Sequence, residues 1–365
     1  FKGWKVLLAL TEFALSLLGT FLVRSGVLVS VHAFATDPAR GVFILIFMSI
    51  VVVGSLMLYA WRAPILATQN NAVLRLFSRE GFLLLNNIFL TTAAAMVLFG
   101  TLYPILASAF GYKLSVGPPY FNLMFAILAL PLVAMVGFAY LLRWRKDSWQ
   151  RIAPLLALPV GLSVAAALIF PWVFGHGFAV GLAGALILAF WAMITAVAEL
   201  LRRWRTGSGL LAGMRRTPRA VYGQCMAHFG VGVFVLGVGM TMTHSIERDV
   251  GMTMGDVESL AGYELTFDGV TLGEGPNYQA EVGLIRVAKD GRQISRIRTE
   301  KRHYFSQEAP MTDAGIDVKL HRDIYISLGE SLGAGAFGIR LYYRPFVRCI
   351  WLGGIIMMLG GLLAI

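Results

Sequence analysis

The chain has 365 residues, which would suit two or three soluble domains, but its composition excludes a soluble protein. Apolar residues make up 57% of the chain, charged residues only 14%, and the mean hydropathy is +0.71. Soluble domains carry roughly 25% charged residues. Disordered, fibrous and disulfide-scaffold proteins are excluded as well, and we expect an integral membrane protein.

The net charge of +11 is unevenly distributed along the chain. Residues 244–343 contain 11 Lys and Arg against 15 Asp and Glu, whereas the rest contains 20 against 5. The basic residues of the rest lie in short loops beside apolar runs. They therefore predict membrane topology and not a nucleic-acid partner, which would need a basic soluble face.

Eight apolar stretches are long enough to cross about 30 Å of hydrocarbon. Seven precede the polar segment and one follows it: 6–23, 42–61, 83–106, 121–142, 152–170, 178–201, 222–242 and 346–365. Fifteen Lys and Arg flank these spans on one side, against only Arg24, Arg40 and Lys113 in the short loops opposite. The first side is therefore predicted to be cytoplasmic, and the polar segment to face outward. In a Gram-negative bacterium this predicts an inner-membrane protein with a periplasmic polar segment.

The polar segment is predicted to form strands at 263–267, 278–288, 293–304 and 323–328, because apolar and polar residues alternate there. Asp290-Gly291 between two of these runs is a strong hairpin signal. We therefore expect a polytopic α-helical membrane protein with a small β-rich domain, a barrel or a sandwich, inserted before the last helix. The predicted division is a transmembrane bundle at 1–243, a β-rich periplasmic domain at 244–343 and a final helix at 344–365.

The chain begins at Phe1 without an initiator Met or a signal peptide and stops inside an apolar run, so we expect an excerpt of a longer membrane protein. Its two cysteines, Cys225 and Cys349, are predicted near opposite ends of adjacent spans. They are too far apart to form a disulfide. With no Cys-x-x-Cys pair either, thiol–disulfide chemistry is not expected of this chain.

His228 is the strongest candidate for a functional residue. The span that begins near Tyr222 places it roughly 9 Å inside the membrane, where an ionisable side chain is a functional candidate by default. Gly232 and Gly239 lie on the same helical face and would clear room above the ring for a flat ligand. The alternative is an interhelical hydrogen bond, with the glycines allowing close helix packing. Both interpretations stay open on the residues alone.

His32 lies between two spans on the predicted outer surface, with apolar neighbours that suit an interfacial helix. It is either an iron ligand or an ordinary surface residue. Arg24, at the outer membrane edge, either pairs with propionates or snorkels to the interface. The other histidines are predicted to be structural or at the surface, and Glu12 to face the bundle interior.

Several segments together resemble the CcmF family, the haem-lyase component of bacterial cytochrome c maturation. They cover the whole chain in order but only the family's C-terminal portion. These segments are residues 19–28 and 30–35 around His32, 226–231 around His228, and 245–250, 322–329 and 342–345.

The resemblance implies two haem sites. The family holds a haem b in the membrane between two transmembrane histidines, and His228 is similar to the second of them. It receives another haem at the outer face between two periplasmic histidines, and His32 is similar to the second of those. The first member of each pair and the family's Trp-rich segment would lie upstream of Phe1.

The implied activity is that of a haem lyase subunit, which needs upstream residues and partners. A CcmE-type chaperone delivers haem, and apocytochrome c presents its Cys-x-x-Cys-His thiols for thioether formation. CcmH-type and CcmI-type subunits assist. The membrane haem acts as a redox relay, with quinol as a candidate electron donor. Two other classes stay open: a membrane transporter or haem exporter, although no repeated halves are evident, and a non-catalytic assembly scaffold.

Overall fold

The computed structural model describes residues 2–25, 38–66, 75–205, 209–306 and 309–365. In this part of the chain eight helices are long and apolar enough to cross a membrane, at the places that the hydropathy predicted. They are α1 (Lys2–Arg24), α2 (Pro38–Leu66), α3 (Arg79–Ala109), α4 (Pro118–Phe138), α5 (Trp149–Val173), α6 (Val180–Trp204), α8 (Arg219–His244) and α9 (Val347–Ala364). A short helix, α7 (Leu210–Arg216), was not predicted.

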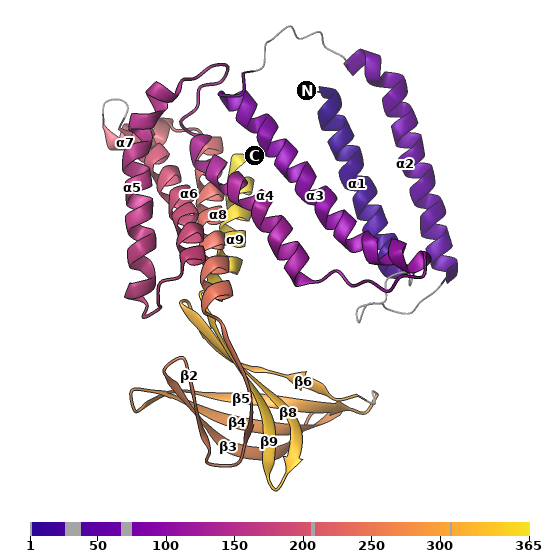
Figure 1. Ribbon diagram of the computed structural model, residues 1–365, viewed down its shortest axis with the longest axis vertical. Helices are drawn as coiled ribbons and strands as arrows, with labels where there is room; N and C mark the ends of the chain where they lie inside the picture. The colour runs from indigo at the N-terminus through magenta and orange to yellow at the C-terminus, as the bar shows by residue number, and fades with distance from the viewer. Residues whose placement is uncertain (1, 26–37, 67–74, 206–208, 307–308) are drawn as a thin grey trace. The chain divides into compact units, whose positions relative to one another are not determined.

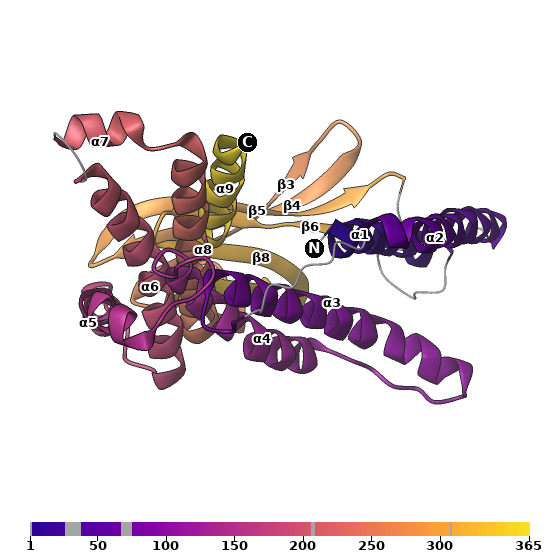
Figure 2. The ribbon, with the colours of Figure 1, turned by 90° about the horizontal axis from the view of Figure 1, so that it is seen from above.

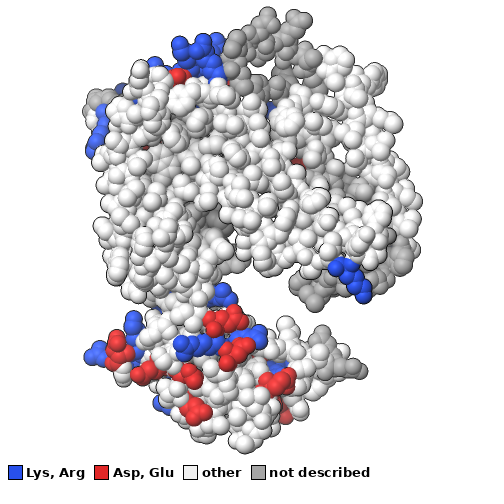
Figure 3. Space-filling model, in the orientation of Figure 1, with Lys and Arg blue, Asp and Glu red and all other residues white. Residues whose placement is uncertain are grey.

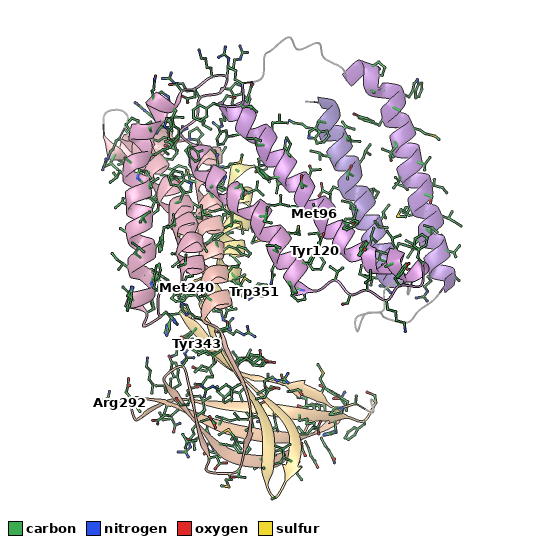
Figure 4. The ribbon with its side chains drawn as sticks, in the orientation of Figure 1. Met96, Tyr120, Met240, Arg292, Tyr343 and Trp351 are labelled. Carbon is green, nitrogen blue, oxygen red and sulfur yellow. The ribbon has the colours of Figure 1, made fainter. Side chains whose placement is uncertain are left out.

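The chain folds into two compact units. The amino-terminal unit comprises Phe1–Arg75 and Asn87–Leu128, and the carboxy-terminal unit comprises Leu76–Asn86 and Ala129–Ile365. In the first, α1 and α2 lie side by side (Figure 2). There the Tyr120 hydroxyl at the start of α4 donates a hydrogen bond to the Met96 carbonyl of α3, at 3.1 Å (Figure 4).

The second unit combines the helices α5 to α9 with a β-rich domain below them in Figure 1. Among the described residues of this domain, nine strands form two antiparallel sheets, one in the order β1-β9-β8-β7 and one in the order β2-β3-β4-β5-β6. Their bounds are β1 (Ile246–Met252), β2 (Val257–Leu260), β3 (Tyr263–Glu274), β4 (Tyr278–Lys289), β5 (Arg292–Tyr304), β6 (Met311–Asp313), β7 (Gly315–Lys319), β8 (Arg322–Gly333) and β9 (Ala336–Pro345).

The two sheets bury one apolar core between them, which makes the domain a sandwich. Phe267 and Ile285 from one sheet and Ile326 and Leu341 from the other are fully buried in it. Asp290 and Gly291 both have positive φ at the tip of the β4–β5 hairpin, as the predicted two-residue turn requires. Of the strands found, β1, β2, β6, β7 and β9 were not predicted.

Buried charge connects the sandwich to the helices. Arg322, at the start of β8, is 1% exposed and bonds to Asp317, and its guanidinium lies 4.8 Å from the centre of the Tyr263 ring. The next residue, Asp323, accepts from Arg348 of α9 at 2.9 Å. This ion pair fixes the first turn of α9 to the sandwich edge.

Charge is distributed differently over the two parts of this unit. In Figure 3 both signs are mixed over the sandwich, the helix surface is almost bare of charge, and Lys and Arg gather at the helix ends away from the sandwich. In the sequence-based prediction, the helix ends that carry the basic residues are the cytoplasmic ends, and the sandwich lies on the outer side.

Candidate functional site

The candidate site is centred on α8, which is packed between α6 and α9. Its glycines form two stripes, one for each neighbour. Gly223, Gly230 and Gly237 repeat every seven residues and lie against α9. Gly232 and Gly239, also seven apart, lie against α6. Small residues at this spacing let helix backbones approach closely, which is how apolar helices associate in a membrane.

His228 lies on the flank of α8 that faces α6 and the end of α4. Its side chain is half-buried, and its Nδ1 atom is buried without a hydrogen-bond partner among the described residues. The Tyr140 ring packs edge-on against the imidazole, with ring centres 5.2 Å apart. The histidine is therefore held by packing, while one of its polar atoms stays unsatisfied.

Tyr140 and Cys225 form the wall beside the imidazole. The Tyr140 hydroxyl points at the Gln224 carbonyl at 3.5 Å, and Cys225, one turn before His228, is 1% exposed. A phenol hydroxyl and a thiol are both neutral in their ordinary state, so this wall adds no charge beside the ring.

These surroundings fit an iron ligand. A buried polar atom without a partner costs about 1–3 kcal/mol, so a group that bonds to the Nδ1 atom of His228 would recover that cost. A neutral imidazole is a common axial ligand for haem iron. The orphaned Nδ1 atom is the feature of this structure that the fit depends on.

Gly232 has a different role from the predicted one. A Cβ atom at this position would lie 2.5 Å from the Ala189 carbonyl oxygen and equally close to the Met193 side chain, both on α6. The space above Gly232 is therefore filled by a neighbouring helix and does not accommodate a flat ligand. Gly239 likewise faces Ala185 and Leu182 of α6. The helix-packing alternative holds for both glycines.

His32 lies outside the described residues, so the structure does not place it. Arg24 is the last residue of α1 and is exposed. It belongs to the amino-terminal unit, whereas His228 belongs to the carboxy-terminal one. Glu12 is exposed on α1 in the described structure and not buried as expected.

Three histidines, His176, His244 and His321, lie near one another, and the sequence analysis did not predict this cluster. His176, between α5 and α6, stacks on His244 at the end of α8 with ring centres 4.8 Å apart and an interplanar angle of 26°. Tyr343 of β9 approaches His176 at 6.3 Å, where the sandwich meets the helices (Figure 4). Burial and the neighbouring His244 and His321 lower the pKa of His176. The only signal in the sequence was that each of these histidines was predicted at the same side of the membrane.

Comparison with known proteins identifies the family. Residues 243–345 match the family model described as the CcmF C-terminal beta-sandwich. The whole chain is 46% identical to the cytochrome c-type biogenesis protein CcmF of Pseudomonas aeruginosa and 42% identical to that of Escherichia coli, and covers 55% of each. The chain belongs to the CcmF family.

The fold agrees with this assignment. A solved structure named cytochrome c heme lyase CcmF superposes with a TM-score of 0.76 at 22% identity, over 100% of this chain and 55% of that one. The predicted family and the predicted fold class are thereby confirmed. Because the chain spans about half the length of the CcmF relatives it matches, the activity, the site residues and the partners of the whole protein remain proposals.

Proposed function

We propose that this chain is the haem-handling part of a CcmF-type haem lyase in cytochrome c biogenesis. Relatives that align over its whole length carry the name cytochrome c-type biogenesis protein, which supports this class of function. The observation that carries the proposal is His228, half-buried within a transmembrane helix with an unpartnered ring nitrogen. Buried polar side-chain atoms usually have a partner. His244, at the end of α8, also has an unpartnered ring nitrogen among the described residues, so the depth of His228 within the span is what sets it apart.

In this proposal His228 would hold a transmembrane haem b through its imidazole. A haem held there would supply one-electron redox chemistry. The chain's own contribution is to position a neutral imidazole in apolar surroundings, because a charged ring is costly at that depth. Tyr140 restrains the ring by its edge-on contact, and the close packing of α6 and α9 on α8 keeps that side of the helix dry.

The second part of the proposal concerns the outer face. His32 binds a haem that is the substrate, delivered by a CcmE-type chaperone, and Arg24 contacts its propionates. Apocytochrome c receives that haem through thioether bonds, assisted by CcmH-type and CcmI-type subunits, and quinol is the proposed electron donor. The sandwich, on the same predicted side of the membrane, offers a folded surface to such partners.

The test is an absorption spectrum of the intact protein purified in detergent. We expect a reduced b-type haem spectrum that disappears in His228→Gly and persists in Cys225→Ser, which alters the neighbouring buried side chain without removing the ligand. In His32→Ala we expect the membrane haem to remain while cytochrome c attachment stops, since the two sites lie at different depths.

Two results would contradict the proposal. If a haem-free protein still matures cytochrome c, then His228 is not needed as a haem ligand for this activity. Loss of both the membrane haem and the attachment activity in His32→Ala alone would show that the two sites are not separate.

A further inference from the structure

An apolar groove runs along α6 on the side of α5, and the mechanism proposed above does not use it. Its volume is about 820 Å³, within the range of roughly 300–1,000 Å³ that is typical of ligand sites. Leu158 and Leu162 of α5 form one wall and Val197 of α6 the other, and Met193 and Phe229 also line it. α5 and α6 lie side by side in Figure 1, in one compact unit.

The groove is basic at one end only. Of the described lining residues, two carry charge, Arg202 and Arg205, and both lie where α6 ends. Glu199 accepts from Arg202 at 2.7 Å and from Arg203 at 2.6 Å, so one carboxylate is shared by two guanidinium groups, and Arg205 adds a further positive charge at this end. Arg202 remains 62% exposed. The end of the groove therefore keeps a net positive charge that an anion can neutralise.

The groove also has the length of one membrane leaflet. Phe190 and Arg205, its extreme residues on α6, are separated by about 22 Å of helical rise. One leaflet contributes about 15 Å of hydrocarbon, or about 20–22 Å when its headgroup region is included. An acyl chain beside Met193 and Val197 thus places its headgroup at the arginine end.

The groove is separate from the candidate haem site. Phe229 lines it, but the preceding residue His228 does not and packs against Tyr140 on another flank of α8. Among the residues that the structure describes, the lining of the groove includes no histidine or cysteine that could hold iron.

We propose that this groove binds an anionic phospholipid, with its acyl chains against α5, α6 and Phe229 and its phosphate on Arg202 and Arg205. Basic pockets between transmembrane helices at the cytoplasmic side are suited to such headgroups. The loop charges predict that the arginine end of α6 faces that side. This site is independent of the haem proposal, because neither His228 nor His32 takes part in it.

The test compares lipid retention by the intact protein. The protein is exchanged into a mild detergent, incubated with phosphatidylglycerol or with phosphatidylcholine of the same chains, and examined by native mass spectrometry. We expect the wild type to retain one phosphatidylglycerol molecule in preference to phosphatidylcholine. Arg205→Gln should weaken that retention by about fivefold, the order expected for one basic residue near an anionic headgroup.

Two further variants make the result specific. Ala198→Trp places a bulky ring in the groove and should displace the lipid while keeping both arginines. Arg145→Gln removes an exposed arginine that is not a lining residue of the groove and should retain lipid as the wild type does. The haem spectrum should be the same in all three variants, which keeps this test distinct from that of the haem site.

Four outcomes would overturn the proposal. Equal retention of the two lipids would show that the groove has no preference for an anionic headgroup. Loss of the preference in Arg145→Gln as well would show only a general attraction to anions. Recovery of a quinone and no phospholipid from the wild type, lost in Ala198→Trp, would assign the groove to another ligand. A wild type that binds no lipid would show that the groove is filled by another part of the protein.

Discussion

At the scale of single residues, two histidines show what the hydropathy pattern of the sequence can predict and what it cannot. His228 was singled out because an imidazole within an apolar span needs a partner, and the structure leaves its Nδ1 atom without one among the described residues. His176 is predicted from the sequence only to be structural or at the surface, yet its ring stacks on His244, 68 positions later in the chain. Depth in a membrane can be read from hydropathy, whereas a contact between distant segments cannot.

The histidine stack predicts a pH dependence of stability. Burial first, and then the charges of His244 and His321, lower the pKa of His176 below its ordinary value of 6.5. The folded protein therefore binds fewer protons than the unfolded chain. Its stability is fully present above pH 6.5 and is lost as the pH falls through that value toward the lowered pKa.

We expect the melting temperature of the purified protein to fall more steeply between pH 8 and pH 5 in the wild type than in His176→Gln. His303→Gln, which changes a histidine of β5 outside the stack, is the matched control and should behave as the wild type. Identical pH profiles for wild type and His176→Gln would disprove the dependence.

At the scale of elements, the positions of the eight long helices agree with the hydropathy prediction, although their ends differ by up to five residues, and several strands were not predicted. Each apolar run forms a helix, because a helix satisfies its own backbone hydrogen bonds and unsatisfied N–H and C=O groups are too costly in lipid. Four strands carried clear alternation. The remaining strands, such as β1 and β9, were missed because charged and glycine residues interrupt their pattern, and their pairing over seven positions decides their conformation.

The glycine stripes of α8 and α9 give a prediction at this scale. A Cβ atom on Gly353 would lie 2.6 Å from the Phe234 nitrogen and 2.7 Å from the Gly230 oxygen, whereas one on the adjacent Gly354 meets nothing within 4 Å. Gly353→Val must therefore push the two backbones apart. We expect it to cost about 1–3 kcal/mol, as overpacking usually does.

Thermal unfolding of the two variants in detergent measures this effect. Gly354→Val is the matched control and should melt close to the wild type. Equal destabilisation by both substitutions would mean that the loss of glycine, and not the close contact of α8 with α9, is responsible.

At the scale of the whole molecule, the charges of the loops predict how the chain crosses the membrane. The sandwich should lie outside and the α4–α5 connection, which includes Lys146, inside. The two native cysteines are buried, at 1% and 9% exposure, so labelling of an introduced cysteine has little background. Met254, 77% exposed on the sandwich, is a suitable outer position.

We expect a membrane-impermeant maleimide to label Met254→Cys in intact cells whose outer membrane has been permeabilised. Lys146→Cys should be labelled only after the inner membrane is broken. The reverse pattern would invert the topology and move both the sandwich and the basic end of the lipid groove to the opposite faces.

The sequence by itself determined the membrane class, the eight spans, the β-rich insertion and the residue at the centre of the candidate site. Each of these depends on free energies that act locally along the chain: the transfer of apolar segments into lipid and the turn preference of Asp290-Gly291. Only the tertiary structure decided the role of Gly232, the stacking of His176 on His244 and the groove that ends at Arg202 and Arg205. These features arise where segments that are distant in the sequence come into contact. Whether a space between two helices is open or filled depends on the side chains of both helices, so neither segment determines it alone.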